Sequence, residues 1–389
     1  MNRGYVCLAD GAVVGRQLLS GEVMELVLLV HPREGHARGA SGEEQAGELY
    51  ERLGGALGEL GAAPADVVTQ RLYLADIAGD ADTVLARSKD FYGSGAGPAT
   101  SLIGERPLDP PGACTLLACA VVGADRSSAE VVVEPWAGLT PPAGGRVVRV
   151  GHRRHFFLHN LTARGGSFRE QAEGVFARAA EALSGVGLNF HNVLRTWIYL
   201  RDIERDYDQL NEVRSQFFGQ QAVKLLPAST GIEGFPHPPE ARVMLELYAL
   251  KNPGGVAVRP LRTATMNEAP EYGSAFTRGL LVSEAERVTA LVSGTASVDE
   301  RGATAHVGDP RAQMHRAWEN FSGLLADGGV EAGDILWAVT YLKEPGILPA
   351  LQEELLSRRL PPFPHQVVQG RLCRPEFLGE IEALARSVR

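Results

Sequence analysis

The stretch REQAEGVFARAAEALSGVGLNFHNVLRTWIYLRDI, residues 169–203, decides the fold because its pattern occurs three times in this chain. Its first half carries apolar residues at three- to four-residue spacing, which is typical of a helix, and it ends as a β-rich run that closes on Tyr-Leu. A Gly-containing turn separates the two parts. Residues 43–77 and 311–345 show the same order of helix, turn and strand.

The spacing of two residue types supports the repeat. In each copy, a Gln precedes the Tyr of the Tyr-Leu pair by 28 positions. The pairs are Gln45 with Tyr73, Gln171 with Tyr199, and Gln313 with Tyr341. This agreement indicates three copies of one structural unit, in which these residues set the architecture rather than the chemistry.

Each copy continues with a second amphipathic segment, a Pro-containing break and a closing strand, which predicts an α+β unit. Gly/Pro-rich stretches at 136–146 and 252–262 predict linkers between domains 1–135, 146–252 and 263–389. The units could be separate beads or could close into an intramolecular pseudo-trimer. Closing strands as apolar as CTLLACAVV, residues 114–122, favour closure because they need cover on both faces.

The third closing strand, GEIEALARS at 379–387, carries two carboxylates, Glu380 and Glu382, on one face. They are either a solvated edge or a place of chemistry. The counterparts of Glu380 in the first two copies are Thr115 and Met244, and those of Glu382 are Leu117 and Glu246. Glu380 is therefore singular and is the candidate acid, whereas Glu382 recurs and is predicted to be scaffold.

The composition excludes several classes of protein. There are 47 acidic and 38 basic residues, a net charge of −9, and no Lys/Arg block, so no nucleic-acid partner is expected. No apolar run approaches a membrane span, and the four cysteines fit no disulfide scaffold. We expect a cytoplasmic protein without a membrane partner or cofactor, and a monomer or weak oligomer if the trimer is built into one chain.

The segment GHRRHFFLHN, residues 151–160, invites a metal interpretation because it contains His152, His155 and His159. Their spacing does not place all three on one strand face, and no acidic partner follows at a zinc-like interval. We therefore expect no metal site.

The repeated block and the Pro breaks resemble the Rid family (YjgF/UK114), whose small α+β subunits form trimers with active sites between subunits. The last third, with ALVSGTASVDERG at 290–302 and CRPEFLGEIEALA at 373–385, resembles the chorismatases, as does LPASTGIEG at 226–234. The resemblance implies three tandem Rid-like (chorismate-mutase-like) domains and conversion of chorismate to pyruvate and a ring acid. The Arg that Rid imine deaminases use at the Pro break is replaced by Thr100, Ser229 and His365.

The chemistry that the resemblance implies, together with residue spacing, selects particular candidate residues. Glu380 would be the acid that protonates the enol ether, and Arg278 and Arg214 would hold the substrate carboxylates. Tyr207 and Thr230 would donate hydrogen bonds. His365, Gln369 and Cys373 are spaced by four, so on a regular strand they would share one face of the site. Cys373 resembles the cysteine of chorismatases that form 3-hydroxybenzoate.

Each of these residues also has a structural interpretation. The arginines could form salt bridges, Tyr207 and Thr230 could pack or cap locally, Cys373 could be a core residue, and His365 could have no function. The alternatives to a chorismatase-like enzyme are a Rid-like enzyme acting on another unsaturated or imine intermediate, and a non-enzymatic ligand-binding protein. The product could be 3-hydroxybenzoate, which is favoured, or a dihydroxycyclohexadienoate.

Overall fold

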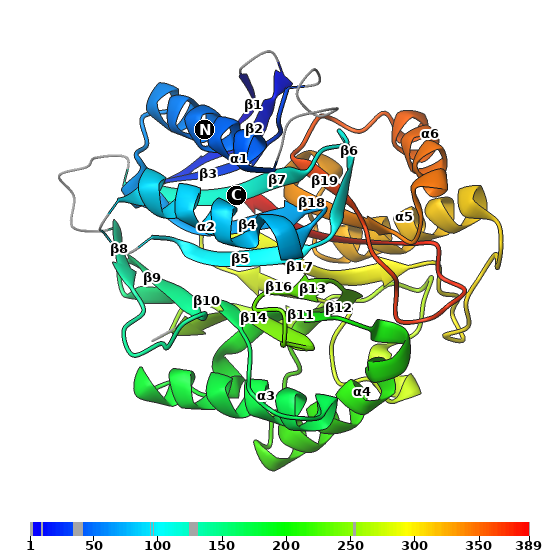
Figure 1. Cartoon of the computed structure of the whole chain (residues 1–389). Coiled ribbons are helices and arrows are strands. Elements are labelled where there is room, and N and C mark those ends of the chain that lie inside the picture. Colours follow the sequence, from blue (N-terminus) through cyan, green and yellow to red (C-terminus); the bar gives the residue numbers. More distant parts are fainter. Residues whose placement is uncertain are drawn as a thin grey trace.

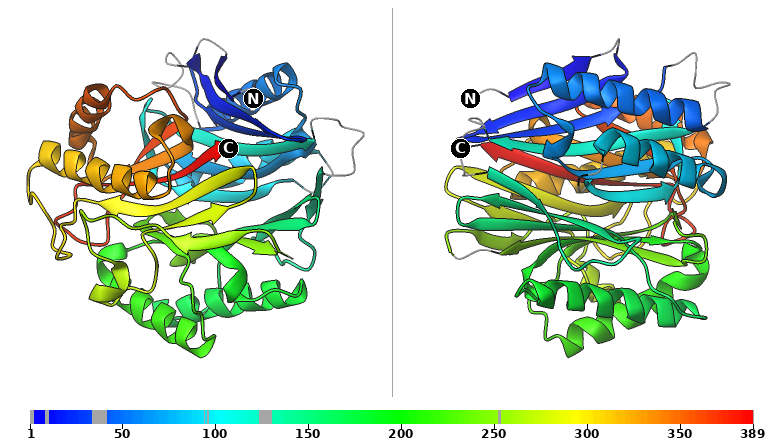
Figure 2. Two further views of the ribbon diagram at one scale, coloured as in Figure 1. Left: turned by 180° about the vertical axis from the view of Figure 1, so that it is seen from behind. Right: turned by 60° about the vertical axis from the view of Figure 1, so that its left-hand side comes forward.

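The computed structural model describes residues 3–8, 11–33, 42–93, 95, 97–123, 131–251 and 254–388. The chain is α+β, as predicted, with three β-sheets that each carry a pair of long helices (Figure 1). The helix pairs lie on the outside and the sheets face one another inside (Figure 2). No helix in the described part of the chain is long and apolar enough to cross a membrane.

The first sheet has the strand order β1-β2-β3-β7-β4-β5-β13. Its strands are β1 (Arg3–Leu8), β2 (Val13–Ser20), β3 (Val23–Val30), β4 (Val67–Leu74), β5 (Ala99–Gly104), β7 (Cys114–Gly123) and β13 (Phe235–Pro236). Helices α1 (Gly42–Glu59) and α2 (Ile77–Tyr92) cover it, with a short 3-10 turn, η2 (Pro64–Asp66), before β4.

The second sheet has the order β12-β11-β14-β10-β9-β8. Its strands are β8 (Val131–Pro135), β9 (Gly144–Val150), β10 (Arg153–Leu161), β11 (Val193–Leu200), β12 (Ala228–Glu233) and β14 (Val243–Lys251). Helices α3 (Phe168–Gly185) and α4 (Ile203–Gln220) cover it, and η3 (Phe190–Asn192) precedes β11. Strand β8 precedes the Gly/Pro-rich stretch at 136–146 and yet pairs with β9.

The third sheet has the order β15-β16-β17-β20-β18-β19-β6. Its strands are β6 (Arg106–Asp109), β15 (Ala257–Pro260), β16 (Gly279–Ser283), β17 (Arg287–Ala296), β18 (Ile335–Leu342), β19 (His365–Gln369) and β20 (Gly379–Val388). Its helices are α5 (Pro310–Asp327) and α6 (Leu348–Arg358), with 3-10 turns η4 (Ala269–Tyr272), η5 (Ala332–Asp334) and η6 (Pro345–Ile347).

The repeated Gln ties the first helix of each unit to the closing strand. In each copy its side-chain oxygen accepts the backbone N–H of the residue immediately before that strand. The bonds run from Ala113 to Gln45 at 2.8 Å, from Arg242 to Gln171 at 2.7 Å, and from Leu378 to Gln313 at 2.9 Å. A buried amide that satisfies a backbone group in this way fixes how the helix crosses the sheet.

The repeated Tyr residues lie where the three sheets meet. Tyr73, Tyr199 and Tyr341 are fully buried and belong to one apolar cluster that draws residues from all three sheets. The closing strands are therefore covered on both faces, by helices outside and by the other sheets inside.

The units also exchange strands and charges. The two-residue strand β13 leaves the second unit to pair with β5, and β6 leaves the first unit to pair with β19. Buried ion pairs join Arg71 to Glu246 at 2.7 Å and Arg195 to Glu382 at 2.6 Å. These contacts hold the first sheet to the second and the second to the third.

Candidate active site

Glu380 and Glu382 lie two residues apart on β20, and both are buried, but their surroundings differ. Glu382 has no exposed surface. Its carboxylate accepts hydrogen bonds from Arg195 at 2.6 Å and from Trp197 and Tyr341 at 3.1 Å each, and Thr230 also donates to it. A carboxylate with four donors around it is a fixed anion that joins two sheets, which agrees with a scaffold role.

Glu380 instead faces a pocket between the second and third units, and 6% of its surface is exposed. Burial raises the pKa of Glu380 to about 8, and the negative charge of Glu382 adds to the increase, while Arg278 and Arg195 oppose it. The side chain is therefore a carboxylic acid at neutral pH and can donate a proton.

The pocket around Glu380, called the Glu380 pocket below, has a volume of about 260 Å³. Helix α4 and strand β12 form one wall, and the segment before β16, strand β17 and the turn after β19 form the other. It is lined by Tyr207, Asp208, Asn211, Arg214, Ser229, Gly231, Tyr272, Ser274, Phe276, Arg278, Gly294, Ala296, Val298, Cys373, Arg374, Phe377 and Glu380. The site thus depends on residues far apart in the sequence.

Three arginines line the pocket, and neutral groups accept their hydrogen bonds. Arg278 donates to the backbone oxygen of Asn267 at 2.9 Å, and Arg214 donates to the side-chain oxygen of Asn211 at 2.6 Å. Arg374 donates to the backbone oxygen of Gly302 at 2.7 Å. Among the described residues, none of the three forms an ion pair with a carboxylate, so their charges are available to an anionic ligand.

Aromatic rings keep these guanidinium groups in place. Arg214 and Arg278 lie over the ring of Phe276 at 5.3 Å and 5.8 Å, and Arg278 and Arg374 lie over Tyr272 at 5.2 Å and 5.3 Å. Stacking of this kind suits planar guanidinium groups and restricts their rotamers. The pocket therefore presents oriented cations beside one neutral acid.

Tyr207 and Cys373 lie in the same pocket, on α4 and in the turn after β19. Burial and the neighbouring Glu380 raise the pKa of the Cys373 thiol to about 12, and burial raises the pKa of Tyr207 well above its usual value. Both groups are neutral hydrogen-bonding partners at physiological pH, and Cys373 is not a thiolate nucleophile.

Gly294 on β17 makes room for the acid. A Cβ atom at this position would lie 1.7 Å from the Oε1 atom of Glu380 and 3.2 Å from the Cγ2 atom of Thr230. Only glycine leaves the Glu380 carboxyl in its observed position. The stretch at 290–302 contains this residue, but nothing in its sequence pattern indicates the steric role.

Five of the eight expected site residues line the Glu380 pocket: Glu380, Arg278, Arg214, Tyr207 and Cys373. Thr230 lies behind it, where it donates to Glu382 and accepts the N–H of Gly294 at 3.0 Å. Gln369 lines a different hollow, together with Glu105 and Arg106. These two residues do not line the pocket.

His365 also lies away from the Glu380 pocket. Its Nε2 is 2.8 Å from the hydroxyl of Thr340, its ring packs 5.2 Å from that of Phe363, and burial lowers its pKa to about 4. The expectation that His365, Gln369 and Cys373 share a strand face was wrong for Cys373, because β19 ends at Gln369. Cys373 reaches the pocket through the turn instead.

Sequence reasoning missed Arg374, Tyr272 and Phe276. All three lie outside regular strands and long helices, so no periodicity points to them. Arg374 lies within the stretch at 373–385, and Tyr272 and Phe276 lie within YGSAFTRG at 272–279, which is a looser match to the chorismatases. Their place in these stretches was their only signal. Within the described residues, no cluster of three or more His, Cys, Asp or Glu side chains could hold a metal ion.

Comparisons with known proteins support the resemblance expected from the sequence. Residues 158–251 match the family model described as Endoribonuclease L-PSP. A RutC family protein of Aquifex aeolicus is 30% identical over 84 residues, which is 22% of this chain and 65% of that protein. The chain thus covers slightly less than two thirds of this curated relative. The residues that match the family model lie in the middle unit.

Solved structures extend the likeness over more of the chain. A chorismatase superimposes on 82% of this chain and 93% of its own, with a TM-score of 0.60 and 15% sequence identity. A YjgF/YER057c/UK114 family member from Mycobacterium tuberculosis is 28% identical and covers 26% of this chain and 82% of its own, with a TM-score of 0.23. The first of these matches shows that the chain has the fold of a chorismatase. The predicted resemblance to the Rid family is supported by the sequence matches above.

Proposed function

We propose that this protein is a chorismatase-like enzyme that converts chorismate to pyruvate and a ring acid. The observation that carries the proposal is the acid in the Glu380 pocket, with a pKa raised to about 8, beside three arginines that pair with no described carboxylate. Cleavage of the enol ether of chorismate needs a protonated acid, and binding of its two carboxylates needs oriented cations. The Glu380 pocket supplies both.

The reaction begins with transfer of the Glu380 proton to the methylene carbon of the enol ether side arm, which produces an oxocarbenium ion. The carboxylate that remains on Glu380 stabilises this cation electrostatically. Glu382 contributes by repulsion, because its fixed charge keeps Glu380 protonated before the substrate reacts. Glu382 does not touch the pocket and acts as a positioning residue.

Two carboxylates of the substrate are held by Arg278, Arg214 and Arg374, which approach from different elements. Tyr207 and Cys373 contact the ring from the α4 and turn sides, and exclude water from part of it. If the ring hydroxyl attacks the ring carbon that bears the side arm, the ether C–O bond at that carbon breaks, pyruvate leaves, and the ring aromatises to 3-hydroxybenzoate as one proton returns to Glu380. If water adds to the oxocarbenium carbon instead, the hemiketal collapses to pyruvate and a dihydroxycyclohexadienoate, and again one proton returns to Glu380. The neutral thiol of Cys373 beside the acid favours the first route, in line with its resemblance to the cysteine of chorismatases that form this product.

The direct test is to incubate the purified protein with chorismate, to measure pyruvate by a coupled assay, and to separate the ring acids by chromatography. We expect pyruvate and one dominant ring acid, with Glu380→Gln slower by about 10²–10⁴-fold. No turnover, or full activity in Glu380→Gln, would overturn the proposal.

The match of residues 158–251 to the Rid-type model favours a second candidate, a Rid-like enzyme that acts on another unsaturated or imine intermediate. Against it stands the Pro-break position, where Ser229 lines the pocket in place of the arginine of imine deaminases. A panel of enamine and imine substrates, followed by ammonia release, would separate the two candidates.

We further infer that domains 1–135, 146–252 and 263–389 form an intramolecular pseudo-trimer in the cytoplasm, with one working site. The buried pairs Arg71–Glu246 and Arg195–Glu382 support closure of the three units. Thr115, the counterpart of Glu380 in the first unit, donates to Gln366 at 2.8 Å and offers no acid. Sedimentation velocity should show a monomer or a weak oligomer, and a tight trimer of chains would contradict this.

A further inference from the structure

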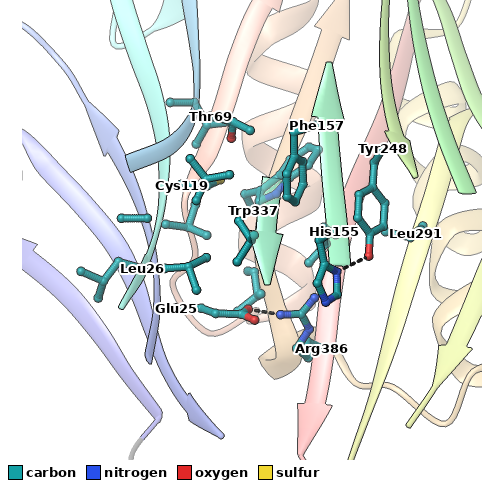
Figure 3. Close-up of a pocket in the computed structure, with 18 of the residues that line it drawn as sticks. Glu25, Leu26, Thr69, Cys119, His155, Phe157, Tyr248, Leu291, Trp337 and Arg386 are labelled. Carbon is teal, nitrogen blue, oxygen red and sulfur yellow. Dashed lines mark hydrogen bonds and ion pairs between the residues drawn. The ribbon is translucent and has the colours of Figure 1, made fainter. Parts of the chain in front are cut away.

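A second pocket lies between the three sheets, and none of its lining residues lines the Glu380 pocket. This inter-sheet pocket has a volume of about 130 Å³ and is bordered by β3, β4 and β7 of the first sheet, β9, β10, β11 and β14 of the second, and β17, β18 and β20 of the third (Figure 3). Native cores contain few voids of this size. The pocket therefore needs an explanation.

The pocket arises because equivalent positions of the repeat carry side chains of unequal size. Four residues after the Glu380 position, the copies have Cys119, Tyr248 and Leu384. On the neighbouring strands, Cys119 pairs with Val27, whereas Tyr248 pairs with Phe157. The first unit thus has the small side chains of Cys119 and Val27 where the second has the aromatic pair of Tyr248 and Phe157. This difference in side-chain volume leaves the pocket unfilled.

The walls suit a flat ring. Phe157 and Tyr248 stack with ring centroids 5.1 Å apart, and Trp337 and Leu291 face them from the third sheet (Figure 3). An apolar cavity of roughly 150 Å³ in another protein holds benzene, so a six-membered ring is an appropriate guest for a pocket of this size.

The outer end of the pocket is charged. Arg386 and Arg287 both pair with Glu25, and Arg287 and Arg153 both pair with Glu284. This cluster has three cations and two anions, so one positive charge is in excess. Arg386, Arg287 and Glu25 line the pocket, whereas Arg153 and Glu284 do not, so the lining at this end also carries one positive charge more than its negative charge.

A further polar group in the lining also favours a ligand that carries oxygen atoms. His155 lines the pocket, and its Nδ1 is 2.8 Å from the hydroxyl of Tyr248. Its Nε2 is buried and has no hydrogen-bond partner among the described residues. A buried ring nitrogen without a partner is costly, and a ligand oxygen or hydroxyl would satisfy it.

We propose that the inter-sheet pocket binds a small aromatic monocarboxylate of the benzoate class. The ring lies between Cys119 and the Phe157–Tyr248 pair, and the carboxylate points to Arg386 and Arg287. Its charge balances the cationic excess of the outer cluster, and His155 supplies one further hydrogen bond. Because the inter-sheet pocket shares no lining residue with the Glu380 pocket, the proposal does not depend on the reaction proposed above.

The test uses the full chain and two probes. Crystals soaked in 4-bromobenzoate should show anomalous bromine density between the three sheets. In calorimetry, benzoate should bind about tenfold more tightly than benzyl alcohol, because only benzoate carries the charge that the arginines pair with. Bromine found only in the Glu380 pocket, or nowhere, would overturn the proposal, and equal affinity for the two probes would overturn the role of the carboxylate.

Variants separate the two pockets. Cys119→Phe should fill the inter-sheet pocket and abolish benzoate binding there, and Cys119→Leu provides a milder change should the larger ring unfold the chain. Arg386→Met should weaken benzoate by about tenfold and leave benzyl alcohol unchanged. Glu380→Gln should retain benzoate in the inter-sheet pocket. If Glu380→Gln lost this binding while Cys119→Phe kept it, the site would be the Glu380 pocket and the proposal would be wrong.

Discussion

Arg195 on β11 and Glu382 on β20 form a fully buried ion pair at 2.6 Å that joins the second and third sheets. The same carboxylate lies two residues from Glu380, whose pKa it helps to raise. One interdomain contact therefore serves both the fold and the protonation state of the candidate acid. Removal of this charge should alter stability and pH dependence together.

Glu382→Gln is expected to do both. Loss of the anion leaves Arg195 buried without its partner, which should lower the free energy of unfolding by about 3–5 kcal/mol. It also removes a like charge near Glu380, so the pKa of Glu380 should fall and the alkaline limb of the activity profile should move to lower pH. Denaturant unfolding and a pH series of kcat/KM measure the two effects.

Glu246→Gln is the matched control for this change. Glu246 is also fully buried and pairs with Arg71 at 2.7 Å, so its loss should destabilise the protein similarly. It is not among the groups that shift the pKa of Glu380. An equal displacement of the pH profile in both variants would show that the shift comes from general loosening rather than from the charge of Glu382.

The pH dependence of the wild-type protein follows from the acid form of Glu380. With a pKa near 8, the group is protonated at and below neutral pH and ionises above it. Activity on chorismate should therefore be nearly constant below about pH 7 and fall about tenfold per unit well above pH 8. An activity that rises with pH through 8 would show that Glu380 works as a base.

The same pKa has a consequence for stability. Glu380 has a higher pKa in the folded protein than in the unfolded chain, so the unfolded chain releases this proton first and stability falls as pH rises from about 4.5 to 8. Glu380→Gln removes this penalty, and at pH 7 it should raise the free energy of unfolding by on the order of 2 kcal/mol. The gain should disappear near pH 4, where the acid is protonated in both states. Urea titrations at the two pH values measure it.

The fold could be predicted because its determinants are local and repeated. The 28-residue spacing of Gln and Tyr reflects two contacts that each unit makes, one to the start of its closing strand and one to the common core. The pairing of β6 and β13 with strands of other units could not be predicted. Strands of four and two residues are too short for their sequence pattern to indicate which strand they pair with. Their pairing depends on how the units meet.

The candidate site could be predicted only where the repeats differ. Glu380 stands out because Thr115 and Met244 occupy its equivalent positions, and a break in symmetry is visible in sequence. Arg374 and Gly294 have no such signal. Arg374 reaches the pocket through a turn, and Gly294 matters because a Cβ atom at its position would collide with the Glu380 carboxyl. Such roles depend on tertiary geometry.

Arg278→Met should weaken substrate binding more than it slows chemistry. Arg278 is buried, lines the pocket and is held by Asn267 without a described carboxylate partner, so its positive charge is available to the substrate. We expect KM for chorismate to rise by about 10- to 100-fold. Arg205→Met is the control, because Arg205 lies on the exposed side of α4 and pairs with Asp206 at 2.6 Å. Equal effects of the two changes would argue against a binding role for Arg278.

Gly294→Ala tests whether the position of the Glu380 carboxyl matters for activity. The added methyl group would lie 1.7 Å from Oε1 of Glu380, and that end of the side chain is the part that can move away. The variant should therefore fold but lose about 10²-fold or more in kcat, since a misplaced acid transfers its proton poorly. Gly219→Ala on α4, where a Cβ would meet nothing within 4 Å, should keep full activity. If Gly294→Ala also kept full activity with an unchanged pH profile, the Glu380 carboxyl would not be the proton donor in the position observed.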